Sequence, residues 1–347
     1  MRRKLSRYDT LYRKHTMPKP LTLLLGGQMA APHADYLKQH LYTEWNIVTW
    51  IEGEPFEDFA ALAPTADAFI GGFIKGDWPT VPKLRLYQVP FTGYDWIGPE
   101  TLPAGCPLCT TFEHETTIAE YVLATMLEWE FRIGEADRKF RLDGWKGRKM
   151  GYGPTHGELY GKTVGIVGYG HIGQEVARRA LAFGMRCIAV TRTIRSTEEP
   201  LTWVDSMELL EQLLGESDFV LIGLPLSKET RGLFNTARFA QMKPDGVLIN
   251  VGRGQIVDEE SLYKALVENT IGGAIIDVWY GYPTPNNPRR SPWNFPFNKL
   301  DNIVMTPHNS ALSGEMHNRR WRFIADNLDR FYRGEPLHNI CFEGTAT

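Results

Sequence analysis

Two residues suited to anion binding and proton exchange each follow an apolar run in the C-terminal half of the chain. In "INVGRGQIVDEESLYKAL", Arg253 lies between two glycines where an apolar strand should end. In "NIVMTPHNSA", His308 occupies the equivalent place after a second apolar run. Open α/β sheets present ligand-binding groups at the carboxyl ends of their strands. Either residue alone is more often structural than functional, so its interpretation depends on the surrounding pattern.

A third segment, "DVWYGYP", begins with Asp277 at the end of another apolar run. It continues with three aromatic residues and a glycine before Pro283. Aromatic residues beside proline and glycine more often fill a core than line a site. The segment is therefore either the end of a core strand or one wall of a reaction chamber.

A glycine-rich loop links an expected strand to an expected helix in "TVGIVGYGHIGQEVARRALAFGMRCIAV". Gly168 permits the tight turn, Gly170 allows backbone amides to approach a pyrophosphate, and Gly173 allows the helix to pack closely. The N-terminus of the helix then faces the anion. This arrangement predicts a dinucleotide-binding site.

The end of the next strand indicates which dinucleotide binds. An NAD site usually has an acid there, but this chain has Thr191, 18 residues beyond Gly173. Arg192, Thr193 and Arg195 follow it. Because a hydroxyl and two guanidinium groups suit a 2′-phosphate, the predicted cofactor is NADP, with NAD as the alternative.

These residues require a framework of parallel strands, and the chain shows the pattern for one. Short apolar runs alternate with longer amphipathic runs, which is typical of βαβ units. The expected strands are, in order, "LTLLLGG", "NIVTWI", "ADAFIGG", "LRLYQVP", "TVGIVG", "MRCIAV", "FVLIGLP", "GVLINVG", "GGAIIDV" and "NIVMTPH". One long helix is expected from Thr116, followed by a turn-rich crossing between domains. An amphipathic helix from Trp321 is expected to return to the first domain.

Length and charge narrow the class of protein. A chain of 347 residues is expected to form two domains of roughly 150 residues. The 38 basic and 41 acidic residues leave a net charge of -3, which offers no overall field for nucleic acid or an anionic membrane. The expected partner is therefore a small molecule.

The cysteines and the N-terminus give weaker signals. Four cysteines make no disulfide framework, and Cys106 and Cys109 in "CPLC" have no second pair to complete a zinc site. No metal is expected, and the setting is expected to be reducing and cytoplasmic. Residues 1–18 are interpreted as a basic tail, and both Met1 and Met17 suit a natural start. The apolar run that follows is too short for a signal-peptide core or a membrane span.

The order of these segments resembles the D-2-hydroxyacid dehydrogenase family, which includes formate and phosphonate dehydrogenases and glyoxylate/hydroxypyruvate reductases. The likeness extends from Leu21 onward and also includes "VPFTGYDWI", "TTIAEYVLATML", "DFVLIGLPLSKETRGLFN" and "NLDRFYRGEPLHN". It implies two α/β, Rossmann-like domains, with parallel sheets flanked by helices and an active site in the interdomain cleft. The substrate domain would comprise residues 19–128 and 310–347, and the dinucleotide-binding domain residues 129–309. The resemblance also implies a homodimer.

The resemblance assigns roles to individual residues. Arg253 would hold the substrate carboxylate and polarise the reacting carbonyl, and His308 would exchange the hydroxyl proton during hydride transfer. Asp277 matches the acid that holds the nicotinamide carboxamide. The backbone at Thr92 and Gly93 matches the loop that binds the substrate carboxylate. The remaining residues implied to bind cofactor are His171, Ile172, Leu224, Pro225 and Val251.

Two positions depart from the family pattern. The Glu that usually pairs with the catalytic His is replaced by Tyr282, five residues beyond Asp277, so the proton relay is altered. Formate dehydrogenases also lack this acid, because formate oxidation moves a hydride without a hydroxyl proton. However, the Asn that helps to hold formate in those enzymes aligns with His114. Tyr282 is predicted to be catalytic and His114 to bind substrate.

The sequence therefore predicts a nicotinamide-dependent reductase or dehydrogenase of 2-hydroxy or 2-oxo acids. Formate dehydrogenase-like hydride transfer is one alternative. A nucleotide-sensing scaffold, like the corepressors that share this fold, is another, although a scaffold has no physical need for both Arg253 and His308. The sequence does not identify the acid, the physiological direction, or a carboxylate that replaces the missing Glu.

Overall fold

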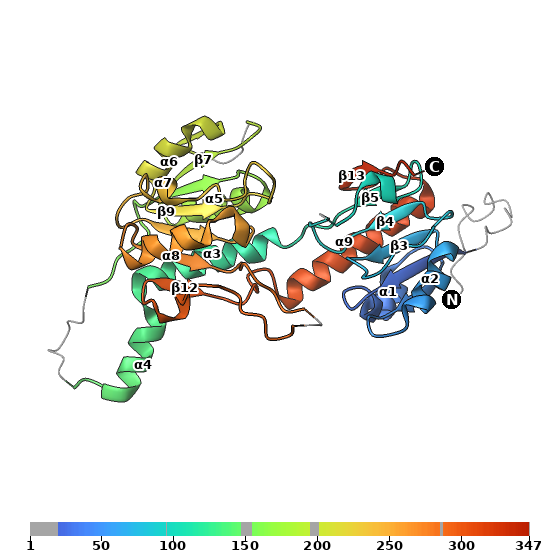
Figure 1. Ribbon diagram of the computed structural model, residues 1–347, viewed down its shortest axis with the longest axis horizontal. Helices are drawn as coiled ribbons and strands as arrows, with labels where there is room; N and C mark the ends of the chain where they lie inside the picture. The colour runs from blue at the N-terminus through green and yellow to red at the C-terminus, as the bar shows by residue number, and fades with distance from the viewer. Residues whose placement is uncertain (1–19, 95, 147–154, 195–200, 285–286, 347) are drawn as a thin grey trace, which may run out of the picture. The chain divides into compact units, whose positions relative to one another are not determined.

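The computed structural model describes the chain except for residues 1–19, 95, 147–154, 195–200, 285–286 and 347 (Figure 1). The described residues form two compact units. Unit 1 comprises Met1–Glu113 and Gly314–Thr347, and unit 2 comprises His114–Ser313. Each unit has its own sheet and its own core.

Unit 1 contains a six-stranded sheet with the strand order β13-β5-β4-β3-β1-β2. Five strands are parallel, and β13 pairs antiparallel with β5. The strands are β1 (Leu21–Gly26), β2 (Trp45–Trp50), β3 (Ala68–Gly71), β4 (Leu86–Gln88), β5 (Pro107–Cys109) and β13 (Ile340–Glu343). The helices are α1 (Ala34–His40), α2 (Phe56–Leu62) and α9 (Gly314–Arg333).

Helices cover both faces of this sheet because alternate strand residues point to opposite sides. Leu24 and Phe69 pack with α2, whereas Leu23 and Leu25 pack with α1 and α9. The predicted C-terminal helix therefore packs on the N-terminal sheet, as expected, and it begins earlier than Trp321.

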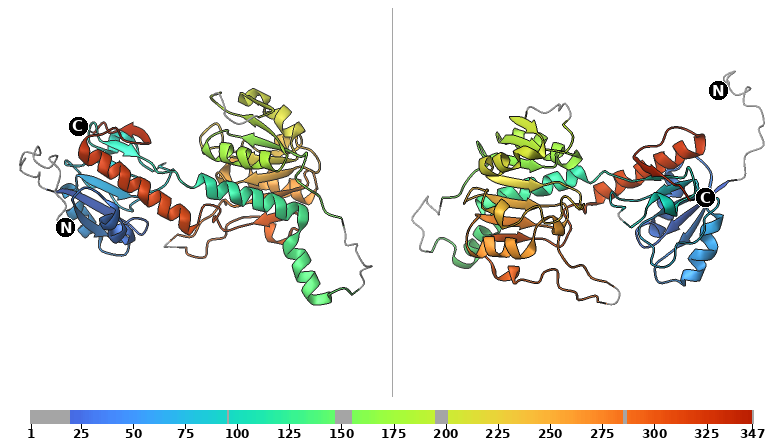
Figure 2. Two further views of the ribbon diagram at one scale, coloured as in Figure 1. Left: turned by 180° about the vertical axis from the view of Figure 1, so that it is seen from behind. Right: turned by 45° about the horizontal axis from the view of Figure 1, so that its top comes forward.

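Unit 2 contains a seven-stranded parallel sheet with the strand order β12-β11-β10-β9-β6-β7-β8. Figure 2 shows the ribbon of the chain from two further directions. The strands are β6 (Thr163–Val167), β7 (Arg186–Val190), β8 (Trp203–Asp205), β9 (Phe219–Ile222), β10 (Val247–Asn250), β11 (Gly273–Ile276) and β12 (Ile303–Met305). The helices are α3 (Glu115–Phe131), α4 (Ile133–Asp143), α5 (His171–Ala182), α6 (Leu210–Glu216), α7 (Thr236–Phe239) and α8 (Glu259–Val267).

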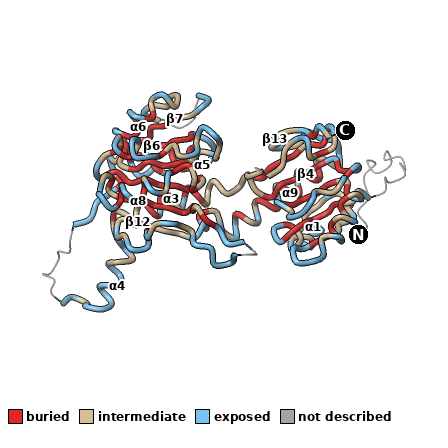
Figure 3. The backbone as a smooth tube through the Cα atoms, viewed as in Figure 1, coloured by how far each residue is buried: buried red, intermediate tan, exposed pale blue. Residues whose placement is uncertain are grey.

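The unit 2 sheet is covered on both faces, which explains its continuous apolar strands. One face packs against α3 and α5, and the other packs against α6, α7 and α8. The buried strands are the red segments of the tube in Figure 3. Strand order reverses between β6 and β9, which places a ligand-binding switch point at the carboxyl ends of these two strands. The predicted fold class, α/β with two parallel sheets flanked by helices, is confirmed.

Two local predictions were wrong. The single long helix expected from Thr116 is two helices, because Arg132 adopts a left-handed conformation with φ of 52° between α3 and α4. The edge strand β8 was not expected at all, since Trp203–Asp205 has only three residues. The compact units divide after Glu113 and after Ser313, and α3 packs against α5 within unit 2.

The described residues contain neither a helix that could span a membrane nor a group of three His, Cys, Asp or Glu side chains placed to hold a metal ion. Cys106 and Cys109 are buried, and burial raises the pKa of each thiol to about 12. Thiolate formation is therefore strongly disfavoured, which argues against redox chemistry at the "CPLC" segment.

Candidate cofactor and active site in unit 2

The glycine loop lies between β6 and α5 and has the geometry that its pattern predicts. Gly168 has φ of +101°, and a Cβ atom there would lie 2.9 Å from the carbonyl carbon of Gly223. A Cβ atom on Gly173 would lie 2.9 Å from the carbonyl oxygen of Gly168. Gly170 differs, because no atom lies within 4 Å of the position that its Cβ would take. The loop is therefore closely packed at Gly168 and Gly173, whereas space for a ligand remains at Gly170.

The start of α5 supplies donors for an anion. Gly170 is the N-cap of this twelve-residue helix, His171 is exposed and Ile172 is half-buried. The first amides of a helix have no partner within the helix, and its dipole favours negative charge. The open space over Gly170 and this helix N-terminus fit the pyrophosphate of a dinucleotide. His171 Nδ1 lies 3.9 Å from Glu115 Oε1, so protonation would pair these two groups.

The residues predicted to select the cofactor follow β7. Thr191 is half-buried, and its amide donates to the carbonyl of Asp205 at 2.9 Å. Arg192 and Thr193 are exposed and remain accessible to a ligand. Arg195 lies outside the described residues.

The turn that carries Arg253 is held by a buried asparagine. Asn250 donates through Nδ2 to the carbonyl of Arg253 at 3.1 Å and accepts from the amide of Gly252 at 3.1 Å. Arg253 is half-buried, and Nη1 donates to the carbonyl of Gly252 at 2.9 Å. A Cβ on Gly254 would lie 2.4 Å from the carbonyl oxygen of Trp279, so only glycine fits beside the arginine.

The other predicted cofactor residues lie along the same edge of the sheet. Leu224 and Pro225 follow β9, and Val251 follows β10, which is the neighbouring strand. Leu224 is half-buried, Pro225 is exposed and Val251 is buried.

His308 lies in a turn that Asp277 anchors. Asp277 is fully buried at the end of β11, and its Oδ1 accepts from Thr306 Oγ1 at 2.5 Å and from the amide of Asn309 at 3.0 Å. Its Oδ2 accepts from the amide of Ser310 at 3.1 Å. His308 has φ of 58°, a left-handed conformation that is unfavourable for residues other than glycine. The hydrogen bonds of Asp277 hold the turn in this conformation. The sequence assigned Asp277 to the nicotinamide and gave no signal for this anchoring role.

Tyr282, at the position of the expected Glu, packs beside His308. Their ring centroids are 5.5 Å apart at an interplanar angle of 57°. The amide of Trp279 donates to the phenol oxygen of Tyr282 at 3.0 Å, which leaves the phenol proton available for another acceptor. Partial desolvation raises the pKa of Tyr282, so the phenol is a neutral donor near neutral pH.

His308 is exposed as a whole residue, but its pKa is lowered, mainly because protein packed around one side of the ring desolvates the imidazolium. The charge of Asp277 raises this pKa, and the Arg253 guanidinium lowers it further. The pKa of His308 therefore depends on the charges of Arg253 and Asp277, at the ends of two neighbouring strands. A lowered pKa is the direction expected where no Glu pairs with the histidine. The three residues lie at the carboxyl ends of the adjacent strands β10, β11 and β12.

The segment "DVWYGYP" serves both purposes considered for it. Trp279 is buried, donates through Nε1 to the carbonyl of Thr306 at 2.8 Å, and packs against Trp293 with centroids 5.0 Å apart. Tyr280 packs against the same core. Tyr282 is 39% exposed and faces the turn of His308. The segment is therefore a core strand end whose last aromatic residue belongs to the candidate site.

The predicted substrate-binding residues are described within their own units. Thr92 and Gly93 are half-buried in a loop of unit 1, after β4. His114 is the N-cap of α3 in unit 2 and is half-buried. Their substrate-binding roles remain predictions from the resemblance.

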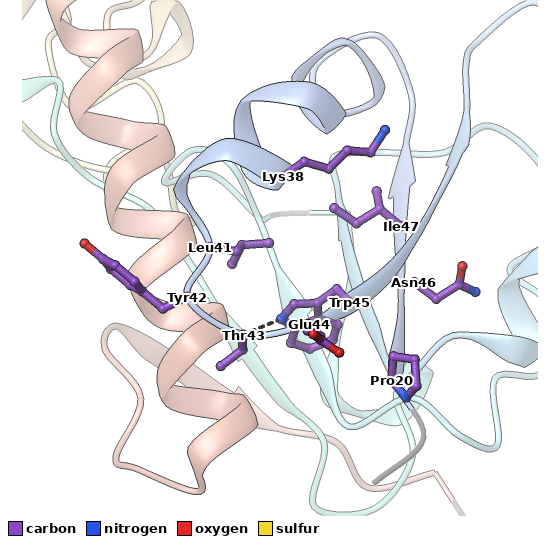
Figure 4. Close-up of a pocket in the computed structure, with 9 residues that line it drawn as sticks. All are labelled: Pro20, Lys38, Leu41, Tyr42, Thr43, Glu44, Trp45, Asn46 and Ile47. Carbon is purple, nitrogen blue, oxygen red and sulfur yellow. Dashed lines mark hydrogen bonds between the residues drawn. The ribbon is translucent and has the colours of Figure 1, made fainter. Parts of the chain in front are cut away.

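A hollow of about 560 Å³ lies in unit 1, at the amino ends of β1 and β2 (Figure 4). On the wall of this hollow, Trp45 Nε1 donates a hydrogen bond to Thr43 Oγ1 at 2.9 Å. None of the predicted site residues lines this hollow. The residues predicted to carry the chemistry, Arg253, Asp277 and His308, lie in unit 2 instead.

Comparison with known proteins identifies this arrangement. The family model described as "D-isomer specific 2-hydroxyacid dehydrogenase, NAD binding domain" matches residues 123–310. A glyoxylate reductase of Pyrococcus furiosus is 37% identical over 259 residues, which cover 73% of this chain and 74% of that protein. A glyoxylate reductase of Thermococcus gammatolerans is 33% identical over 312 residues, or 87% of this chain and 90% of that protein.

The fold comparison agrees. The crystal structure of a D-isomer specific 2-hydroxyacid dehydrogenase family protein from Aeromonas salmonicida has a TM-score of 0.77 and 27% sequence identity, covering 93% of this chain and 99% of that one. The chain is thus an oxidoreductase that uses a nicotinamide cofactor and transfers hydride between it and 2-hydroxy or 2-oxo acids. The protein belongs to the D-isomer specific 2-hydroxyacid dehydrogenase family.

Proposed function

We propose that this enzyme reduces a 2-oxo acid with NADPH, or oxidises the matching 2-hydroxy acid, through Arg253 and His308. The observation that carries the proposal is the set of groups at the carboxyl edge of one sheet. Arg253 follows β10, Asp277 follows β11 and the turn of His308 follows β12, in the sheet that also carries the glycine loop. An arginine fork and a titratable imidazole in one place match a substrate with a carboxylate and an adjacent carbonyl.

In this mechanism Arg253 binds the substrate carboxylate and withdraws electron density from the reacting carbonyl. In reduction, protonated His308 donates a proton to the carbonyl oxygen, and in oxidation neutral His308 accepts it. The bound nicotinamide supplies or receives the hydride. Tyr282 acts beside His308 as a second hydrogen-bond donor to the substrate oxygen, since its phenol accepts from Trp279 and keeps its own proton.

The cofactor would be held along the same edge. The amides at Gly170, His171 and Ile172 would bind the pyrophosphate, and the exposed Arg192 would bind a 2′-phosphate together with Thr191. The further residues proposed to contact cofactor are Gly168, Gly173, Thr193, Arg195, Leu224, Pro225, Val251 and Asp277. From the resemblance, the amides at Thr92 and Gly93 are proposed to bind the substrate carboxylate, and His114 is proposed to bind substrate.

A panel of 2-oxo acids from glyoxylate to phenylpyruvate, each assayed with NADPH and NADH, tests the proposal. His308→Gln should abolish most turnover, and Arg253→Lys should lower kcat/KM by roughly a hundred-fold while NADPH binding changes little, because the charge stays and the fork is lost. Near-normal turnover in Arg253→Lys would remove the arginine from the site. Formate-dependent reduction of the cofactor, without turnover of any 2-oxo acid, would favour the formate dehydrogenase-like alternative.

We propose a homodimer in which a second copy covers α4. No residue of α4 is buried. Its apolar residues Ile133 and Phe140 are 60% and 43% exposed, and they share one face of the helix with Ala136. The charged side chains of α4 pair within the helix, Glu135 with Lys139 and Arg141 with Asp137, and leave the apolar face free to meet a second copy. An antiparallel pair centred on residue 138 would place each Phe140 over the partner's Ala136.

Sedimentation of two α4 variants tests this arrangement. Phe140→Glu should weaken the dimer because it places a carboxylate against Ala136 of the partner subunit, whereas Leu142→Glu, on the opposite face of α4, should leave the dimer unchanged. A dimer unaffected by Phe140→Glu would place the interface elsewhere. We also propose a cytoplasmic location, which the cysteine usage of the chain supports.

A further inference from the structure

A hydrogen-bond chain runs from α3 to the turn that carries His308. Tyr121 Oη lies 2.7 Å from Thr306 Oγ1, and Thr306 Oγ1 lies 2.5 Å from Asp277 Oδ1. The carboxylate is acceptor-only, so Thr306 donates its single proton to Asp277. Thr306 must then accept from Tyr121, which fixes the direction of the chain from the phenol through the hydroxyl to the carboxylate.

The chain ends on the group that holds the histidine turn. Beyond Thr306, Asp277 accepts only from the backbone amides of Asn309 and Ser310 among its described bonds. These two residues directly follow His308 in the chain. The left-handed backbone at His308 persists only where its surroundings hold it, and this carboxylate supplies three of the holding bonds.

Three groups set the electrostatic environment of the imidazole. Among the described residues, Asp277 carries the charge that raises the pKa of His308, whereas desolvation and the Arg253 guanidinium lower it. The neutral phenol of Tyr282 packs against the ring. Burial raises the pKa of Tyr121 to about 12, so its proton is present as a donor throughout the working pH range.

We propose that Tyr121 and Thr306 are positioning residues: through Asp277 they hold the turn of His308 and keep the imidazole within the influence of this carboxylate, whose charge favours the imidazolium. This inference rests on the proposed catalytic role of His308. Asp277 then performs in part the task that the family gives to the Glu replaced by Tyr282. Neither Tyr121 nor Thr306 needs to contact substrate or cofactor for this role.

The test is a titration of His308 by NMR in the full-length protein labelled at histidine Cε1. The chain has nine histidines, and His308→Gln assigns the signal by its loss. Asp277→Asn removes the charge and should lower the pKa of His308 by about one unit, the lower end of the effect of an opposite charge within a few ångströms. Thr306→Val keeps the side-chain shape, removes both bonds of the chain, and should lower that pKa by about half a unit or more as the ring leaves the carboxylate.

Two further variants separate positioning from a general loss of packing. Thr306→Ser keeps the hydroxyl and should restore the titration of the wild type. Tyr121→Phe should shift the titration in the same direction as Thr306→Val but by less, and the double variant should shift no further than Thr306→Val, because both residues belong to one chain. A titration in Thr306→Val within about 0.2 units of the wild type, or additive shifts in the double variant, would overturn the proposal.

Steady-state rates on the same variants keep the two proposals apart. If the pH limb of 2-oxo acid reduction moves with the NMR titration, both hold, and kcat should fall about ten- to a hundred-fold in Thr306→Val from misplacement of the imidazole. If the NMR titration moves but the rate limb stays, the positioning is right and the catalytic assignment of His308 is wrong. If the rate limb vanishes in His308→Gln but the titration is unchanged in Thr306→Val, the catalytic assignment holds and the positioning fails.

Discussion

Replacing Tyr282 with glutamate should return a charge partner to His308 and move the pH dependence of the enzyme. The rings of Tyr282 and His308 have centroids 5.5 Å apart, so a carboxylate placed there would lie within pairing distance of the imidazole. In the wild type the pKa of His308 is lowered by desolvation and by Arg253, and in the part of the chain that the structure describes Asp277 opposes these influences. An added negative charge favours the imidazolium, so Tyr282→Glu raises the pKa.

The size of the shift follows from that separation. For unit charges 5.5 Å apart, Coulomb's law gives about 0.8 kcal/mol at the dielectric constant of water and about 3 kcal/mol at an effective value of 20. These energies correspond to a pKa rise of about 0.5 to 2 units. Tyr282 is 39% exposed, so solvent screening favours the lower half of this range.

The assay is the pH profile of kcat/KM in both directions. Reduction needs the protonated His308, so its rate should fall as pH rises through the pKa of the imidazole. Oxidation needs the neutral form and should rise through the same region. Because the wild-type pKa is lowered from its usual value of about 6.5, the wild-type limb should lie below that pH, and Tyr282→Glu should move it upward.

Matched variants isolate the charge. Tyr282→Gln has the size of the glutamate without its charge and should leave the limb near that of the wild type. Tyr282→Phe should cut turnover without moving the limb, if the phenol donates to the substrate. A wild-type reduction limb near pH 8, assigned to His308 by its loss in His308→Gln, would refute the reasoning, because another acid would then already pair with the histidine.

Three further outcomes are expected. Gly170→Ala should weaken cofactor binding about tenfold without lowering the Tm, because the added Cβ enters only the space assigned to the pyrophosphate. Gly173→Ala should instead lower the free energy of unfolding by about 1 to 3 kcal/mol, because the added Cβ meets fixed backbone. Arg192→Ala should lower kcat/KM about tenfold with NADPH and little with NADH, as measured by initial rates. Asn327→Leu should destabilise unit 1 by about 2 to 4 kcal/mol in urea unfolding, since buried Gln88 loses its 2.7 Å donor.

The parallel strands and the glycine loop were predictable because each depends on local chemistry. Fully buried parallel strands must be continuously apolar, so runs such as "FVLI" and "VLIN" mark β9 and β10 directly. Gly168 and Gly173 were predictable because backbone and side-chain atoms approach them too closely for any Cβ. Arg253 and His308 were predictable from their places at strand ends, because parallel strands bring their carboxyl ends together.

Other features had no local signal. The break at Arg132 depends on one residue adopting a left-handed conformation, and neither proline nor glycine occupies that position. The strand β8 owes its existence to pairing with β7, a long-range contact that three residues do not encode. Tyr121 lies in the apolar pattern of α3 and looks like a core residue until its hydroxyl is seen to meet Thr306.

The absence of the expected Glu shows that a position in a motif can be retained while the chemistry of its side chain changes. The resemblance implies an acid at position 282, whereas this chain has a phenol there that packs beside the ring of His308, so the charge that favours imidazolium must come from elsewhere. Asp277 is the described group that acts in that sense, yet its oxygens are engaged by the turn that it anchors. One carboxylate therefore has both a structural and an electrostatic task. Because these bonds fix Asp277 in the turn, it cannot move toward the imidazole and pair with it. The pKa of His308 should therefore be lower than in a relative with Glu at position 282, and the enzyme should favour reduction at a lower pH.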